Sequence, residues 1–301
     1  MKSKSKVLAA VGISGLLMAG GVISASASTS GYDLFKTAVK NTHNVNSFTA
    51  NVQASLTDNG KVVYQVDSLN TEDLKNHAGS STVKINNDGK KTNVAIYEKN
   101  HQTVVKNSKD NKYYVQQGNE GKFQQKYKTH KNETDSPQMQ KDVEAIFDAL
   151  TKNYQDKIAS TDLGNGNTEL TFDLTKDQIP AVGQAVVSFY LKNMDQQKQH
   201  IGKQEFGFLQ FADLKPQLPQ LKNNITVSEV VLKGEVDQKQ YLIGQEATIT
   251  VSGDDVNGTP HELVLHITSH LDNLNNSKVT TVNLKGKKVV KVKENHHGHE
   301  D

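Results

Sequence analysis

The chain has 301 residues, of which 35 % are hydrophobic, and it contains neither tryptophan nor cysteine. All 35 of its basic residues are lysine, set against 33 acidic residues. The length allows one or two domains, and the low apolar content predicts a core that is thin or spread along a sheet. The lack of cysteine excludes disulfides, thiolate metal sites and cysteine nucleophiles, and the lack of arginine excludes bidentate clamps on phosphate.

The first 27 residues have the pattern of a secretory signal peptide. Three lysines precede the apolar run VLAAVGISGLLMAGGVI, which ends before the small-residue cleavage site Ala25-Ser26-Ala27. An uncleaved membrane anchor is the alternative, although the apolar run is short for one. Because three of the 35 lysines lie in this leader, the mature chain keeps 32 lysines against 33 acidic residues, a formal charge of −1. We expect an exported bacterial protein, extracellular or at the cell surface, whose charge gives no support to nucleic-acid binding.

A helix is predicted over residues 31–43. Ser30 and Asp33 resemble a capping box with Asp in place of Glu, and the apolar residues that follow recur at helical spacing. In SFTANVQASL, residues 47–56, apolar and polar residues alternate instead, which predicts a strand with one dry face.

The turn after this strand contains Asn59 and Gly60. A two-residue loop would carry the dry face onto polar residues of the next strand. A three-residue loop sets Leu56 opposite Val62 and Val52 opposite Val66, with Gly60 as a bulge glycine. Since this register keeps one face dry, we predict the three-residue loop.

The remaining chain reads as two groups of strands separated by helices. Short strands are predicted over residues 80–85, 92–97, 102–107 and 112–117, followed by a polar loop. A second helix begins at Ser136-Pro137, a hairpin covers residues 158–162 and 168–174, and a third helix covers residues 175–195. Strands over residues 225–236, 241–251, 263–271, 279–284 and 288–292 complete the prediction.

This order predicts an α+β fold. We expect a large, curved, antiparallel sheet, a half-barrel-like meander with about three amphipathic helices on its concave face. Strands and helices do not alternate, which argues against a parallel doubly wound sheet. We assign residues 1–27 to the signal peptide, residues 28–293 to this domain and residues 294–301 to a His-rich tail. Two similar units, about 30–130 and 136–293, are an alternative arrangement of the domain.

The sequence contains no recognisable catalytic motif, so we predict a protein that is not an enzyme and has no cofactor. In HELVLH, the second histidine follows five residues after the first, and on a strand this spacing puts the two on opposite faces. The one metal-like cluster is in the tail, where three imidazoles could hold zinc, copper or nickel loosely, a solvated tail being the alternative. These histidines are His296, His297 and His299.

Lysines gather just before the tail, at positions 285, 287, 288, 291 and 293. They could contact anionic lipid at a membrane surface, or wall polymer. Equally, they could protect the edge strand on which they lie from pairing with other chains.

The dry faces of the strands and helices must be covered either by each other or by a ligand. A slot lined by such faces suits acyl chains. The residues predicted to line it are Phe35, Val39, Phe48, Val52, Leu56, Val143, Ile146, Phe147, Leu150, Val186, Phe189 and Tyr190.

The leading helix and strand, YDLFKTAVKNTHNVNSFTANVQASL, precede a long meander that is interrupted by helices such as QIPAVGQAVVSFYLKNM. This arrangement resembles the LolA/LprG-type superfamily, whose half-barrels carry lipids or lipoprotein acyl chains. The resemblance implies an exported carrier of lipid or another apolar ligand, although this chain has no lipobox cysteine. The alternative is a secreted cell-surface or matrix interaction protein with a fully packed sheet.

Overall fold

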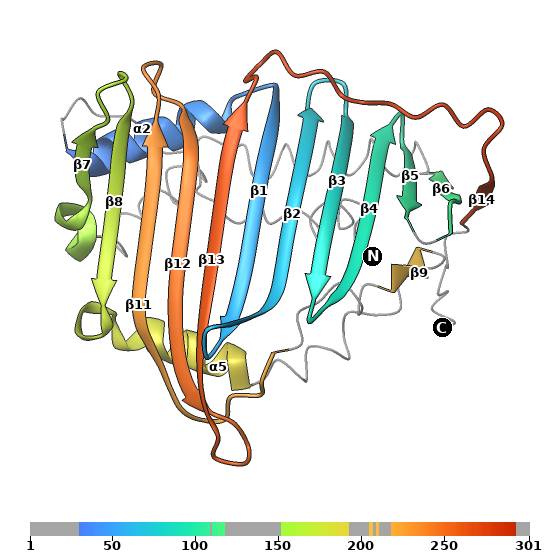
Figure 1. The fold of residues 1–301 in the computed structure, drawn as a ribbon. Coiled ribbons are helices and arrows are strands. Elements are labelled where there is room, and N and C mark those ends of the chain that lie inside the picture. The colour runs from blue at the N-terminus through green and yellow to red at the C-terminus, as the bar shows by residue number, and fades with distance from the viewer. Residues whose placement is uncertain are drawn as a thin grey trace, which may run out of the picture.

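The computed structural model describes residues 30–108, 110–117, 152–192, 205–206, 209–210 and 218–292. Its main feature is a sheet of twelve strands in the order β14-β6-β5-β4-β3-β2-β1-β13-β12-β11-β8-β7. Two α-helices, α2 (Gly31–His43) and α5 (Ala181–Lys192), lie on the same face of this sheet (Figure 1). The predicted α+β class with a large curved sheet is therefore confirmed. The predicted signal peptide, the start of the second helix and the His-rich tail lie outside the described residues.

The sheet consists of two meanders joined edge to edge. The first has β1 (Ser47–Asp58), β2 (Lys61–Asp73), β3 (Ala78–Asn87), β4 (Lys90–Lys99), β5 (Gln102–Asn107) and β6 (Tyr113–Gln117). The second has β7 (Ala159–Asp162), β8 (Thr168–Thr175), β11 (Asn223–Val236), β12 (Leu242–Asp254) and β13 (Pro260–Asp272). Strands β1 and β13 pair antiparallel and join the two halves. Whether these halves are two similar units stays a prediction.

Three smaller features complete the described chain. Strand β14 (Val289–Lys291) pairs parallel to β6 at one edge of the sheet. Strands β9 (Glu205–Phe206) and β10 (Leu209–Gln210) form a separate small hairpin. Two short 3₁₀ helices are η2 (Lys152–Lys157) and η3 (Lys176–Gln178).

Helix α2 has the predicted bounds and the predicted cap. The hydroxyl oxygen of Ser30 accepts a 3.2 Å hydrogen bond from the backbone N–H of Asp33, satisfying one of the free donors of the first turn. At the other end, Thr42 Oγ1 accepts a 2.8 Å hydrogen bond from the N–H of Leu242. The buried face of the helix thus lies over β8, β11 and β12, where Val39 packs beside Leu170 and Val236.

The predicted third helix is interrupted at Pro180. Residues 176–178 form η3, and α5 begins only at Ala181. Proline disfavours the helical conformation of the residue before it, and Ile179 accordingly has extended angles of φ −76° and ψ 122°. Gln184 then fixes α5 to the sheet, since its side chain donates to the carbonyl of Val227 (2.8 Å) and accepts from the N–H of the same residue (2.7 Å).

The predicted register of the first hairpin is wrong. Asp58 pairs with Lys61, so the loop has two residues, and a bulge between Leu56 and Thr57 then shifts the ladder. As a result Leu56 lies opposite Tyr64, and Val52 lies opposite Ser68 rather than Val66. The bulge restores the dry face that a two-residue loop alone would have lost.

The predicted strand over residues 279–284 is also wrong. After β13, residues 273–292, here called the C-terminal strap, run along one end of the β1–β5 strands and finish as β14 (Figure 1). The N–H of Asn275 donates to the carbonyl of Ser47 (2.7 Å), and the N–H of Thr280 to Ser80 Oγ (3.2 Å). Val282 and Leu284 pack on a cluster that includes Tyr113. The alternation in this segment therefore reflects an extended chain that crosses the ends of the strands without joining the ladder.

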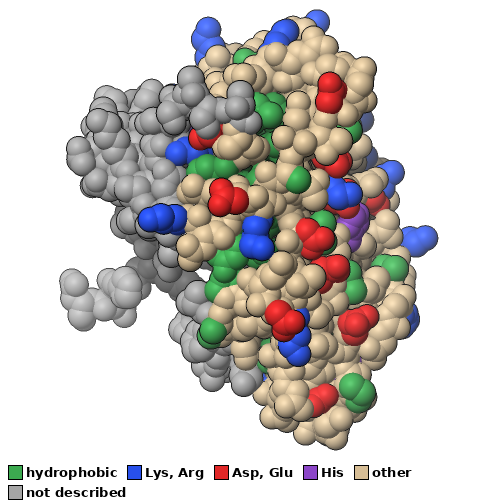
Figure 2. All heavy atoms as spheres, turned by 90° about the vertical axis from the view of Figure 1, so that its left-hand side faces the viewer, with side chains coloured by type: hydrophobic (Ala, Val, Ile, Leu, Met, Phe, Trp, Pro, Cys, Tyr) green, Lys and Arg blue, Asp and Glu red, His purple; other side chains and the backbone are tan. Residues whose placement is uncertain are grey.

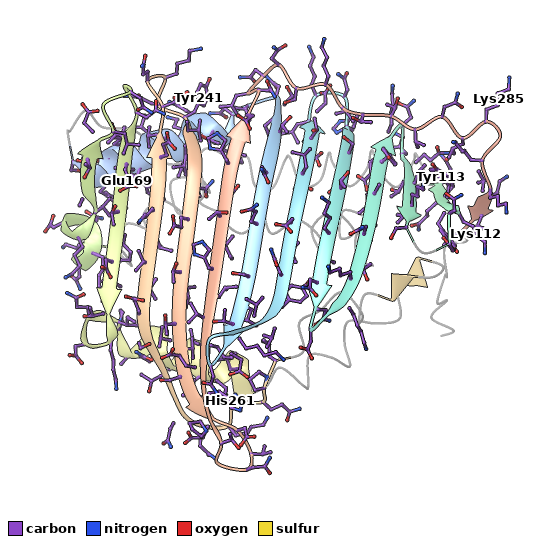
Figure 3. The ribbon with its side chains drawn as sticks, viewed as in Figure 1. Lys112, Tyr113, Glu169, Tyr241, His261 and Lys285 are labelled. Atoms are coloured by element: carbon purple, nitrogen blue, oxygen red, sulfur yellow. The ribbon has the colours of Figure 1, made fainter. Side chains whose placement is uncertain are left out.

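At the opposite end of the strands, two hairpins are locked together (Figure 3). His261 Nδ1 lies 2.9 Å from Asp58 Oδ1, and its Nε2 lies 4.0 Å from Asp255 Oδ2. The side chain of Asn59 accepts a 2.9 Å hydrogen bond from the N–H of Glu262. These contacts fix the β1–β2 turn against the β12–β13 turn.

Candidate functional site

The face of the sheet that carries the helices has an apolar floor on β1–β6 and β13. Because side chains alternate along each strand, the ladder places every second residue of these strands on this face. Ala50, Val52, Val83 and Ile96 are at most 1 % exposed. The inner floor consists of Ala50, Val52, Ala54, Val66, Val83, Ile85, Val94, Ile96, Val105, Tyr114, Ile267 and Leu271.

The structure distributes the predicted slot residues among three clusters. Val52 belongs to the inner floor and the partly buried Phe48 packs against it. Phe35 and Val39 lie instead in the cluster beneath α2, and Leu56 lies in the cluster beneath α5. Val186, Phe189 and Tyr190 lie on α5, but their side chains are not described. Val143, Ile146, Phe147 and Leu150 lie outside the described residues.

The two described α-helices pack mainly against the second half of the sheet. Helix α2 contacts β11 and β12, and α5 contacts β11. Viewed onto the β7–β8 edge, hydrophobic side chains gather in a band, and charged side chains of both signs lie on and around it (Figure 2). The inner floor therefore lies beside the helix-covered half rather than beneath it.

Polar groups interrupt the inner floor along β2 and β3. Asn70 Nδ2 donates a 3.0 Å hydrogen bond to Ser68 Oγ, and the Ser81 hydroxyl donates to Asn70 Oδ1. All three residues are at most 4 % exposed. Buried polar groups are tolerated when they bond to each other, which explains how these three polar residues can lie within an apolar floor.

We expect Asn70→Ala to destabilise the protein. The change leaves the Ser68 and Ser81 hydroxyls without their described partner, at a cost of about 2 kcal/mol. The matched control, Asn70→Leu with Ser68→Ala and Ser81→Ala, removes all three polar groups together and should recover much of this loss. Urea unfolding measures both, and an Asn70→Ala variant as stable as the wild type would contradict the buried network.

Two carboxyl groups form one end of the inner floor. Glu72 pairs with Gly79, and Gly79 pairs with Glu98 on its other side, so the three residues form one row across β2, β3 and β4. A Cβ on Gly79 would lie only 2.7 Å from Glu72 Oε2. The glycine thus provides the space in which the Glu72 carboxyl lies. Glu98 Oε1 accepts a 3.3 Å hydrogen bond from Thr103 Oγ1.

The environment of this carboxyl pair favours the protonated form. Burial, and secondarily the charge of Glu98, raise the pKa of Glu72 from 4.5 to about 7. Burial also raises the pKa of Glu98, against the opposing effect of its hydrogen bond from Thr103. Within the described part of the chain, the carboxyl groups of Glu72 and Glu98 make no other hydrogen bond. At neutral pH, Glu72 can therefore either donate or accept a hydrogen bond at the polar end of an apolar surface.

Sequence reasoning missed this carboxyl pair. One signal was available, because in VDSLNTE Ser68, Asn70 and Glu72 continue the phase of Val66, so a strand with this face buried must bury them too. The partner of Glu72 could not be found that way. It depends on the registers of two further strand pairs.

The described residues hold no group of three or more His, Asp or Glu side chains that could bind a metal ion. The histidines of β13 follow the predicted alternation, with His266 Nδ1 beside Thr248 Oγ1 at 3.0 Å. His296, His297 and His299 lie outside the described residues, so the tail metal site stays a prediction. No described helix has the length and apolarity needed to cross a membrane.

Comparison with known proteins does not assign the chain to a family. No known protein-family profile matches it, and no curated protein sequence matches it. Among solved structures, it is similar to a β-barrel-like protein of a domain of unknown function, DUF1849, from Brucella abortus. The identity is 10 %, the match covers 79 % of this chain and 98 % of that one, and the TM-score is 0.16. A TM-score this low does not establish a common fold.

Proposed function

We propose that this protein is an exported, non-enzymatic carrier of a lipid or another apolar ligand at the bacterial cell envelope. The observation that carries the proposal is the inner floor. It is a broad face of small aliphatic side chains on β1–β6, beside the half of the sheet against which α2 and α5 pack. Its polar end, with Glu72 and Glu98, suits a ligand that has an apolar body and a polar head.

The resemblance of the element order to LolA/LprG-type half-barrels supports the same function. In the proposed mechanism, an acyl chain lies along this floor. Each buried methylene of an acyl chain would then contribute about 0.8 kcal/mol to binding. The rival function is a secreted cell-surface or matrix interaction protein, favoured by exposed outer-face residues such as Leu69, which is 52 % exposed.

The decisive experiment is to purify residues 28–301, which contain every described residue, from a secreting bacterial host. Native mass spectrometry, followed by solvent extraction and lipid analysis, should find about one lipid per chain. A bare chain that also fails to bind fluorescent fatty-acid probes would contradict the carrier function. The interaction-protein function would then be the better explanation of the fold.

A further inference from the structure

The C-terminal strap gives one end of this nearly neutral chain a strong positive charge. Between Asp272 and Glu294 the sequence has no acidic residue. The described part of that stretch carries five exposed lysines: Lys278, Lys285, Lys287, Lys288 and Lys291. Lys112, at the start of β6, is also exposed and lies at the same end of the sheet as Lys285 (Figure 3). The nearby carboxyl of Asp110 accepts the 2.5 Å hydrogen bond of the Tyr114 hydroxyl.

Backbone contacts hold the strap in place, so the positions from which these lysines project are fixed relative to the sheet. The N–H of Tyr113 donates to the carbonyl of Lys288 (2.8 Å), and the N–H of Val292 donates to the carbonyl of Val115 (2.9 Å). Lys106 stacks its ammonium 5.2 Å from the centre of the Tyr113 ring. The lysines are therefore presented together on an ordered edge.

Edge protection alone does not explain this surface. It accounts for lysines on β14 itself, but Lys285 and Lys287 lie in the turn before the strand and Lys112 lies on another segment. Moreover, β14 exposes two apolar side chains between its lysines, with Val289 41 % and Val290 37 % exposed. Edge protection does not account for these exposed valine side chains.

Ammonium groups beside exposed aliphatic groups match the interface of an anionic bilayer. The lysines attract the negatively charged head groups, and the valines can enter the boundary of the acyl region. Without arginine, the surface cannot clamp single phosphates bidentately, so recognition would depend on charge density. We propose that the β6–β14 end of the sheet, with Lys112, Lys285, Lys287, Lys288, Lys291, Val289 and Val290, docks on an anionic phospholipid membrane. This inference does not depend on the carrier function.

The test is sedimentation of residues 28–301 with vesicles of phosphatidylcholine alone, or of phosphatidylcholine mixed with phosphatidylglycerol. We expect binding to the mixed vesicles alone, weakening as salt is raised. The strap variant replaces Lys285, Lys287, Lys288 and Lys291 by Gln. Since each lysine near an anionic surface contributes about a fivefold factor, the loss of four lysines should lower the affinity by up to several hundredfold.

The matched control removes the same four charges at the other end of the molecule. Lys152, Lys157, Lys176 and Lys239 are all exposed in η2, in η3 and in the β11–β12 turn. Their replacement by Gln should leave vesicle binding near the wild-type value. An equal loss in both variants would mean that net charge, not this surface, attracts the protein, and would overturn the proposal.

A second variant, Val289→Ser with Val290→Ser, separates a bilayer from a soluble anionic polymer. It should weaken binding to the vesicles but not to heparin. If it leaves vesicle binding unchanged and heparin binds as tightly as the vesicles do, the partner is a polyanion and the membrane proposal fails. Circular dichroism and urea unfolding check the fold and the stability of every variant.

Discussion

Replacing Glu72 by Gln should make the protein more stable in alkaline solution and leave its stability in acid nearly unchanged. A group whose pKa is raised by folding stabilises the folded state below its unfolded pKa, and this contribution is lost as the pH rises through its folded pKa. For Glu72 the window runs from 4.5 to about 7. The shift corresponds to about 3 kcal/mol at full ionisation. Urea unfolding of the wild type and the variant between about pH 4 and pH 8 measures the difference between their free energies of unfolding.

Asp73 provides the matched control, because it is the neighbouring carboxyl with a shift of opposite sign. Hydrogen bonds from Asn76 lower the pKa of Asp73, so its contribution is present above its unfolded pKa and is lost as the pH falls. Asp73→Asn should thus reduce stability at neutral pH. If the free energies of unfolding of Glu72→Gln and the wild type changed with pH in the same way, the burial of Glu72 would be contradicted.

Filling the inner floor should abolish most of the binding of an acyl ligand. Ala50 is fully buried on β1, where the two halves of the sheet meet, and it pairs with Asn70 on β2 and Leu271 on β13. Ala50→Leu adds three carbons there, which would displace about two ligand methylenes and weaken binding by about tenfold or more. Titration with a fluorescent fatty-acid probe measures this loss.

Ala247 is the matched control for this variant. It is 5 % exposed and lies in the same sheet on β12, in the half against which α2 packs. Ala247→Leu should cost about 1 to 3 kcal/mol of stability through overpacking, as Ala50→Leu should. It should nevertheless leave probe affinity unchanged. Equal affinities for the two variants would place the ligand elsewhere or favour the interaction-protein function.

Local signals were sufficient to place most elements along the chain, although several strands extend two or three residues beyond their predicted bounds. The Ser30–Asp33 cap fixes the start of α2, and Asp88 and Gly89 adopt the positive φ values of 45° and 85° that a tight hairpin turn requires. The first hairpin shows that local signals do not always predict the register of a strand pair. Asn59-Gly60 does form the two-residue turn that its sequence favours, but the bulge at Leu56 and Thr57 corrects the register. A bulge has no clear local signature in this sequence.

The site depends on pairings that no local pattern encodes. Alternation tells which face a residue takes but not which strand lies beside it. The row of Glu72, Gly79 and Glu98 therefore required two registers that the sequence does not specify. For the same reason, Phe35 and Leu56 were grouped with Val52 in one predicted slot, whereas they belong to separate clusters.

The pairing of β1 with β13 has a consequence for how the protein reaches its native state. Thr49 pairs with Asp272, so the central ladder joins segments that are made more than 200 residues apart. Such high contact order slows folding. Because the chain is synthesised from its N-terminus, strands β1–β6 form before β13 exists. Until then one edge of β1 is unpaired, and unpaired edges of this kind promote aggregation. The last long strand to be synthesised, β13, therefore also covers the exposed edge of the first, β1.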